Sequence, residues 1–221
     1  MYSTVIAAVA GEPLIHEALS SVMGQNLPPR SVHVVIDPGA DAGRDWTIRM
    51  KEICPGVQVH VQPETGMAAA VAFGISQVDT PYVSFLDCDD LWLPRKQELQ
   101  INMLRESSDT DAVTCLAQNV DPGRGVSGRP RRSTMFTATT FRTDAFSRFG
   151  MPDPEASHYV WLYRWWSVAM SAGISTDTIE YLGLHRRIHG GNSWITGRER
   201  AHRDLMAELR RLSATKRGAP S

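Results

Sequence analysis

The sequence is poor in cysteine: its 221 residues contain only Cys54, Cys88 and Cys115. An odd number of widely spaced cysteines does not form a disulfide framework, and their spacing matches no zinc-binding pattern. Three isolated thiols suit a reducing compartment, so we expect a cytoplasmic protein. The sequence therefore argues against small disulfide-rich secreted domains and against cysteine-bound zinc domains.

Long apolar runs and an excess of one charge are also missing. No run is long enough to cross a membrane, and the first residues contain neither a basic start nor a cleavage site, so we expect no transmembrane segment. The formal net charge is −1, which gives no reason to expect nucleic acid as a partner. The length of 221 residues is enough for one large domain or two small ones, and the 42% content of hydrophobic residues permits a real core.

The most informative stretch runs from 81 to 94, where an apolar run rich in β-formers meets three carboxylates. The run predicts a buried strand, and Asp87, Asp89 and Asp90 must lie at its end because burying an unpaired carboxylate is costly. In an extended chain Asp87 and Asp89 point to the same side. Two convergent carboxylates favour Mg²⁺ or Mn²⁺. The alternative is an acidic turn in which Asp89 or Asp90 caps a helix that begins near Pro94.

Strands and helices alternate along the N-terminal half, which predicts a parallel α/β sheet covered on both faces. The expected strands are 4–10, 31–36, 57–61 and the run that ends at Asp87, with helices at 14–24, 46–53 and 66–76 between them. Ligands of such sheets bind beyond the carboxyl ends of the strands. Because Asp37, Asp87 and Asp89 fall at those ends, the sequence predicts that they face one site.

The C-terminal half is less regular. We expect a helix from 97 to 105, strands at 111–116 and 137–141, a helix from 142 to 149, and an aromatic helix around Trp161. Segment 121–132 cannot bury apolar area and reads as a mobile loop with four arginines: Arg124, Arg129, Arg131 and Arg132. These could be solvated, or could hold an anionic acceptor or a diphosphate once ordered. Residues 197–213 predict an amphipathic helix that packs on the domain or forms a homodimer contact, and 216–221 a disordered tail.

Several of these motifs together resemble glycosyltransferase family 2. The block from Phe85 to Lys96 is similar to the family's Asp-x-Asp motif with its Trp-x-Pro continuation, and it carries most of the resemblance. The helix at 18–25, the turn at 35–39 and the Gly-rich helix with Gly66, Ala70 and Gly74 also resemble family segments. The likeness covers 3–195 and implies a GT-A fold: a single α/β domain with a Rossmann-like, mostly parallel central sheet flanked by helices.

The resemblance also implies a division of the chain and a set of site residues. Residues 1–116 would form the nucleotide-sugar-binding half, 117–195 the acceptor half, and 196–221 a terminal helix and tail. The late segment 181–193 resembles the family's Arg-x-His segment, which places Arg187 near phosphate and His189 near the metal. The implied nucleotide-binding residues are Ala8, Asp37, Gly66, Ala70, Asp87 and Arg187, and the implied ligands of Mn²⁺ or Mg²⁺ are Asp87, Asp89 and His189.

The expected general base departs from the family pattern. Family members carry a Glu-Asp pair before an aromatic residue and an arginine, whereas this chain has Ser157 and His158 before Trp161 and Arg164. Histidine accepts a proton near neutral pH, so His158 could replace the base. Glu155 or Asp153 could act as the base instead.

The resemblance therefore implies a metal-dependent glycosyltransferase that moves a sugar from a nucleotide-diphosphate sugar to an acceptor, with inversion. A UDP-sugar is the favoured donor, and the acceptor is a sugar, peptide or small molecule. The missing carboxylate pair leaves a second hypothesis open, a catalytically impaired nucleotide-sugar-binding or regulatory protein. A nucleotidyltransferase is a third hypothesis.

Overall fold

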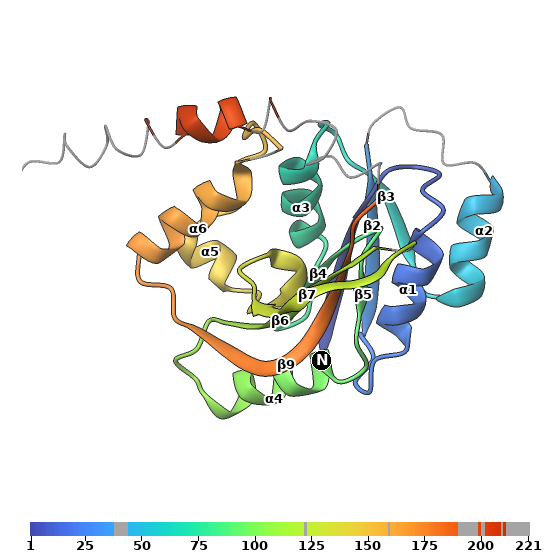
Figure 1. Ribbon diagram of the computed structural model, residues 1–221, viewed down its shortest axis with the longest axis horizontal. Helices are drawn as coiled ribbons and strands as arrows, with labels where there is room; N and C mark the ends of the chain where they lie inside the picture. The colour runs from blue at the N-terminus through green and yellow to red at the C-terminus, as the bar shows by residue number, and fades with distance from the viewer. Residues whose placement is uncertain are drawn as a thin grey trace, which may run out of the picture.

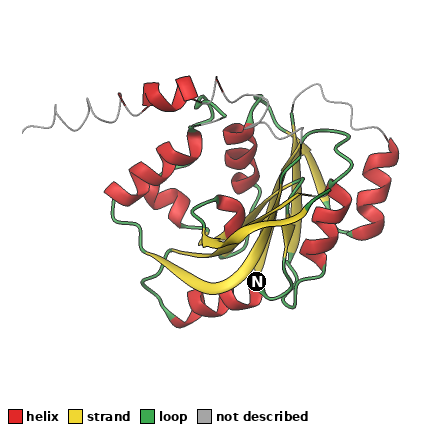
Figure 2. Cartoon of the chain, viewed as in Figure 1, coloured by secondary structure: helices red, strands yellow, loops and turns green. Residues whose placement is uncertain are grey.

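The computed structural model describes residues 1–37, 44–121, 123–158 and 160–189, together with 199, 202–208 and 210 near the C-terminus. A central sheet runs through the molecule with helices against both of its faces (Figures 1 and 2), which confirms the predicted α/β class. The predicted turn at 38–41, the end of the late segment at 190–193 and the tail at 216–221 lie outside the described residues.

The N-terminal half is built, as predicted, from alternating strands and helices. In chain order it contains β1 (Tyr2–Ala8), α1 (Ile15–Met23), β2 (Ser31–Ile36), α2 (Arg44–Ile53), β3 (Gln58–Val61), α3 (Met67–Ser76) and β4 (Tyr82–Asp87). Strand β1 lies between β2 and β4, β3 lies outside β2, and all three pairs are parallel. The carboxyl ends of β1, β2 and β4 therefore meet at one edge of the sheet.

The C-terminal half extends the sheet with pairs of both directions. It contains β5 (Leu91–Trp92), α4 (Lys96–Glu106), β6 (Ala112–Asp121), β7 (Gly125–Arg132), the 3-10 turn η1 (Phe136–Ala138), β8 (Thr139–Arg142), α5 (Ala145–Phe149), α6 (Trp161–Ser171) and β9 (Thr176–Arg187). Among the described residues the strand order is β3-β2-β1-β4-β8-β6-β9-β5, with β7 paired to β6. Strand β8 is antiparallel to β4 and β6, and β9 runs parallel to β6.

Two segments of this half differ from the prediction. The segment predicted as a mobile loop forms the β6–β7 antiparallel hairpin, although every residue of β7 is exposed. Pairing with the backbone of β6, rather than burial of side chains, decides its structure. No strand was expected at 176–187, yet β9 lies between β6 and β5 in the sheet. Smaller differences are that α5 begins only at Ala145 and that the strand expected at 137–141 starts as a 3-10 turn.

The core is divided between the two faces of the sheet. Alternate side chains of β1 point to opposite faces, as a strand requires. Ile6 joins the cluster packed by α1, α2 and α4, whereas Val5 and Ala7 join the cluster packed by α3, α5 and α6. In Figure 1 α1 and α2 stand on one side of the sheet, with α3, α5 and α6 on the other.

The C-terminal helix packs back on the domain through polar contacts. Residues 202–208 are helical. The guanidinium of Arg164 on α6 donates to Glu208, with Nη2 2.7 Å from Oε2, and Ser157 donates to Asp204. Glu208 is buried. These contacts match the packing alternative of the prediction, and the homodimer contact stays a prediction.

Gly74 allows α3 to approach β1 closely, and we expect Gly74→Ala to destabilise the fold. An added Cβ would lie 2.3 Å from Cγ1 of Val5, whose side chain is buried. Overpacking of this kind costs roughly 1–3 kcal/mol, measurable as the free energy of unfolding in urea. Gly56→Ala is the control, because an added Cβ there meets no described atom within 4 Å. Equal stability of the two variants would contradict the close approach.

A histidine pair on the α3 side of the sheet links β2 to β3. Nδ1 of His33 lies 3.2 Å from Nε2 of His60, and Nε2 of His33 lies 3.0 Å from Oγ of Ser31. The rings are stacked with centroids 5.4 Å apart. Burial lowers the pKa of both imidazoles, and the charge of His60 lowers the pKa of His33 further, against a weaker opposing effect of Asp79.

This pair predicts a loss of stability in mild acid. Below the usual histidine pKa of about 6.5, the unfolded chain takes up protons that the folded pair resists, so the free energy of unfolding falls with the pH. His33→Gln removes one of these sites, and its stability should fall less between pH 7.5 and 5.5 than that of the unaltered protein. Urea unfolding at both pH values measures the difference. Parallel pH profiles would show that the pair does not contribute.

Candidate functional site

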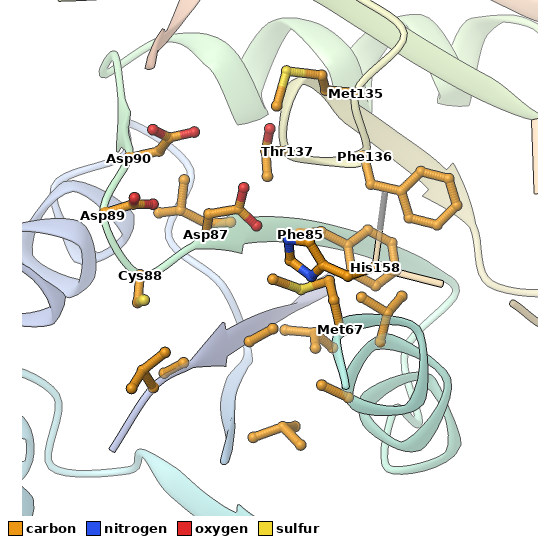
Figure 3. A pocket seen from close by; sticks show the side chains of 18 of the residues that line it. Met67, Phe85, Asp87, Cys88, Asp89, Asp90, Met135, Phe136, Thr137 and His158 are labelled. Carbon is orange, nitrogen blue, oxygen red and sulfur yellow. The ribbon is translucent and has the colours of Figure 1, made fainter. Parts of the chain in front are cut away.

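A cavity of about 600 Å³ opens where β1, β2 and β4 end. This volume is typical of small-molecule sites. Its walls also include the first turn of α3, the turn η1, the start of α6 and the end of β9. Figure 3 shows three carboxylates on one side of this cavity and His158 with Met67 on the other. The site predicted at this edge of the sheet is therefore formed, and it draws on both halves of the chain.

The three carboxylates come together in the turn that follows β4. Asp87 is the last residue of the strand, and the amide of Asp90 donates to the carbonyl of Asp87 at 3.1 Å, which closes the turn. One side-chain oxygen from each of Asp87, Asp89 and Asp90 lies within 4.8 Å of the others. The extended chain considered in the sequence analysis is therefore not found beyond Asp87. The turn brings a side-chain oxygen of Asp90 close to those of Asp87 and Asp89.

The helix-capping alternative for these carboxylates is also wrong. Helix α4 begins at Lys96, its N-cap is Arg95, and no side chain caps it. Asp90 instead is only 2% exposed, and its Oδ1 accepts a hydrogen bond from the amide of Arg187 at 2.9 Å. The acidic residues thus line the cavity and contact β9, and they do not cap α4.

Burial and mutual repulsion perturb two of the carboxylates. Burial, reinforced by the charge of Asp89, raises the pKa of Asp87 to about 7 from a usual 3.8. Burial and the charges of Asp87 and Asp89 raise the pKa of Asp90 well above its usual value. The positive charge of Arg186 acts in the opposite direction on both. The folded cluster therefore favours the binding of protons or of another cation.

The donor atoms of this cluster fit a hard divalent cation. Mn²⁺ and Mg²⁺ prefer oxygen ligands, and carboxylates supply them here. Oδ2 of Asp90 is buried and has no hydrogen-bond partner among the described residues, so the cluster retains an unsatisfied acceptor. His189, which follows the end of β9, places Nε2 3.1 Å from Oδ2 of Asp89. The predicted ligands Asp87, Asp89 and His189 thus line one cavity.

Arg187 has a different position from the one predicted. Its side chain is buried, and Nη1 lies 2.6 Å from Oε2 of Glu17 in α1. Nη2 donates to the carbonyl of Leu14 at 3.2 Å, and Nε donates to the carbonyl of Asp89. Arg187 does not line the cavity, so the structure does not support its predicted phosphate contact. It connects the acidic turn to α1.

Arg186 lines the cavity instead, and the sequence did not single it out. Neighbouring residues of a strand point to opposite faces, so a shift of one position exchanges the buried Arg187 with the half-buried Arg186 that lines the cavity. The alternation of side chains could have pointed to Arg186, but only if 176–187 had been predicted as a strand. Glu12 and Thr137 are further cavity residues that were not predicted.

The predicted nucleotide side of the cavity is organised by Asp37. Oδ1 of Asp37 accepts a hydrogen bond from the amide of Gly66 at 3.1 Å and another from the side chain of Gln62. Gly66 has φ 124°, a conformation that favours glycine, and it directly precedes α3. Ala8 and Ala70 line the same cavity. The two carry only a methyl side chain, which leaves space between the end of β1 and α3.

The candidate bases His158 and Glu155 differ clearly in position. His158 lines the cavity, partly buried just before α6, and burial lowers the pKa of its imidazole. The ring is therefore neutral, and able to accept a proton, at neutral pH. Glu155 is exposed, does not line the cavity, and its amide donates to Oδ1 of Asp153 at 3.1 Å. The geometry favours His158 and does not support Glu155.

Comparison with known proteins finds a sequence family and several curated proteins that this chain matches. The sequence matches the family described as glycosyl transferase family 2 over residues 3–164. It is 27% identical over 109 residues to the putative teichuronic acid biosynthesis glycosyltransferase TuaG of Bacillus subtilis, a match that covers 49% of this chain and 43% of that protein. This chain covers at most 43% of the length of the curated relatives that it matches.

Solved structures of glycosyltransferases share the fold. The mannosyltransferase PcManGT from Pyrobaculum calidifontis, in complex with GDP-Man and Mn²⁺, has a TM-score of 0.70 and 16% identity, and the match covers 95% of this chain and 64% of that one. S. aureus TarS in complex with UDP-GlcNAc has a TM-score of 0.62 and 18% identity, with 86% and 59% covered. These similarities confirm the GT-A fold predicted from the sequence. None of the helices in the described part of the chain is long and apolar enough to span a bilayer.

The acidic cluster predicts binding of Mn²⁺ that depends on Asp89. Asp89→Asn removes a charged oxygen ligand without changing the size of the side chain, so Mn²⁺ affinity should fall by about 100-fold or more, at least the loss seen when partners of metal ligands are removed. Electron paramagnetic resonance of free Mn²⁺ at pH 8 measures the affinity. Asp79→Asn, an exposed residue ahead of β4, is the matched control. Equal Mn²⁺ binding by the two variants would exclude the cluster as the metal site.

Proposed function

The chain belongs to glycosyl transferase family 2, and on this premise we propose that it transfers a sugar from a nucleotide-diphosphate sugar to an acceptor hydroxyl, with Mn²⁺ or Mg²⁺ as cofactor and inversion at the anomeric carbon. The observation that carries the proposal is the single cavity that joins the acidic cluster and His189 to Asp37 on one side and to His158 on the other. The residues that line this cavity could bind a metal–diphosphate complex and a nucleoside, and could supply a general base.

The donor would lie along the carboxyl ends of β1 and β2. Asp37 holds the loop before α3 through Gly66, and it also lines the cavity, where it can accept a hydrogen bond from a base or ribose. The small side chains of Ala8 and Ala70 leave room for the nucleoside, and α3 begins at this wall, where amide groups and the helix dipole favour a negative diphosphate. A UDP-sugar is the donor we propose, since TarS is a structural relative seen with UDP-GlcNAc. The GDP-Man complex of PcManGT makes GDP-sugars the second class to test.

The diphosphate would lie near the acidic cluster, where Asp87, Asp89 and His189 would hold the cation. When bound, such an ion supplies positive charge beside the leaving diphosphate. Arg186, which lines the same cavity, would add a second positive charge and takes the role predicted for Arg187. Arg187 would act by positioning, because its backbone and side chain fix Asp90 and Asp89.

The acceptor would enter on the opposite side, where His158 lies. Its imidazole, kept neutral by burial, would take the proton of the acceptor hydroxyl as that oxygen attacks the anomeric carbon. Attack from the face opposite the leaving diphosphate inverts the configuration. Trp161 and Leu162 at the start of α6 line the cavity beside His158 and would shield the reacting atoms from water.

One observation favours the alternative, a nucleotide-sugar-binding protein with little or no transferase activity. Where family members carry a Glu-Asp pair, this chain has Ser157, which donates to Asp204 of the C-terminal helix, and His158 in place of the carboxylate base. In that case the donor would bind with the metal, but no proton acceptor of sufficient strength would face the acceptor hydroxyl.

Donor binding and donor hydrolysis distinguish the two proposals. Calorimetry with UDP-GlcNAc, GDP-mannose and a dTDP-sugar, each with Mn²⁺, should detect binding of one donor class. Release of free nucleotide should then be slow, metal-dependent and reduced about 100-fold or more by His158→Gln, because general base catalysis contributes 10²–10⁴-fold. Donor affinity should change little in that variant, since the proposed base does not contact the nucleotide.

The control for this experiment is His202→Gln, which alters an exposed histidine of the C-terminal helix. Nucleotide release that is the same in both variants would remove His158 from the mechanism. Donor binding without any release would favour the binding protein. Failure of every donor to bind in the presence of Mn²⁺ would contradict both.

A further inference from the structure

A second, basic cavity adjoins the first. It has a volume of about 370 Å³ and lies between the β6–β7 hairpin and β9. Met135 and Arg186 line both cavities, so the two share a wall. The remaining lining residues are polar, small or basic and come mainly from the hairpin: Ala117, Asn119, Ser127, Gly128, Arg129, Arg131, Arg132 and Ser133. We call this second cavity the hairpin groove.

The strand register brings the groove residues to one face of the sheet. Asn119 of β6 pairs with Ser127 of β7 on one side and with Arg186 of β9 on the other, and directly paired residues share a face. Ala117 pairs in the same way with Arg131. The register shifts between Ala117 and Asn119, and at this shift Nε2 of Gln118 donates to the carbonyl of Gly128 at 2.7 Å. The groove is thus formed by paired strands of the sheet.

The charged residues that line the groove are all basic. Its lining contains arginines and no acidic residue among the described ones. Arg132 forms an ion pair with Glu180 of β9, whereas no ion pair is found for Arg129, Arg131 or Arg186 within the described part of the chain. The formal net charge of the whole chain is −1, so this basic surface is local and does not reflect an overall excess. Guanidinium groups bind phosphate and carboxylate with two parallel hydrogen bonds.

We propose that the hairpin groove binds an oxyanion of the acceptor, a phosphoryl or carboxylate group, and so places the neighbouring acceptor hydroxyl in the main cavity. The inference rests on the proposed function and narrows its acceptor to an anionic molecule. Arg129 and Arg131 would hold the anion, and Arg186 would border both the anion and the donor. A neutral acceptor would leave these guanidinium groups unused.

Small anions test the groove without donor or metal. We would titrate the full chain with glycerol 3-phosphate, glucuronate and the neutral methyl glucoside, and follow backbone amide shifts of β6 and β7 by nuclear magnetic resonance. Both anions should shift these amides, more weakly at high salt, and the neutral sugar should not. The double variant Arg129→Gln/Arg131→Gln should weaken anion binding about tenfold or more, because charge-assisted hydrogen bonds are lost. The control Arg30→Gln/Arg105→Gln removes the same charge from exposed sites elsewhere and should change it less than about twofold.

The two anions also distinguish the acceptor classes. Tighter binding of glycerol 3-phosphate assigns a phosphorylated acceptor, and tighter binding of glucuronate assigns a uronate. Equal binding of methyl glucoside, or equal anion binding by the two double variants, overturns the proposal. Donor calorimetry distinguishes failure of the groove proposal from failure of the proposed function. If the arginine variant binds donor normally but the groove of the unaltered chain binds no anion, only the groove proposal is overturned. Anion binding by a chain that binds no donor would overturn the acceptor role.

Discussion

The crowding of three carboxylates at the end of β4 is the constraint on which this edge of the sheet depends. Like charges within 4.8 Å of one another repel, and burial of Asp90 makes their charged forms more costly still. The turn is held in this form from β9, whose residue Arg187 donates its amide to Asp90 and its Nε to the carbonyl of Asp89. The same guanidinium reaches Glu17 in α1. One buried arginine therefore connects the acidic turn to both halves of the chain.

The parallel half of the fold and the acidic cluster could be predicted because each leaves a local signal. Strands buried on both faces read as continuous apolar runs, and β1, β2 and β4 all appeared in this way. Asp37 and Asp87 follow such runs directly, so the rule that parallel strands place their carboxyl ends at one edge was enough to bring them together. The position of His158 in the cavity came from the family resemblance, because nothing in its local sequence distinguishes it from a structural histidine.

The parts that could not be predicted depend on backbone pairing between strands and not on a hydrophobic pattern. Strand β7 has no buried residue and β9 mixes polar with apolar residues, so neither shows a hydrophobic period. Both strands form through hydrogen bonds to β6. Strand β9 follows β6 only after β7, β8, α5 and α6, so no local pattern indicates its partner, whereas β7 follows β6 directly but lacks the buried residues that would mark it as a strand. The exchange of Arg186 for Arg187 follows from the same gap, since strand parity is known only once the strand is known. The exposure of Glu155 likewise depends on the turn at Asp153, not on its distance in sequence from α6.

The two cavities carry opposite charge although they share a wall. The main cavity is lined by Glu12, Asp37 and the three carboxylates after β4, and the hairpin groove by arginines. A diphosphate would be repelled from the acidic walls unless a cation lies between them, whereas an anion in the groove needs no cation. This difference would keep the two substrates apart: the donor's anionic group would be accepted with a metal ion and the acceptor's without one. Arg186 lines both cavities, so it lies at the boundary between the acidic and the basic surface. A near-neutral composition conceals this division because the opposite charges cancel in the sum while remaining separate in space.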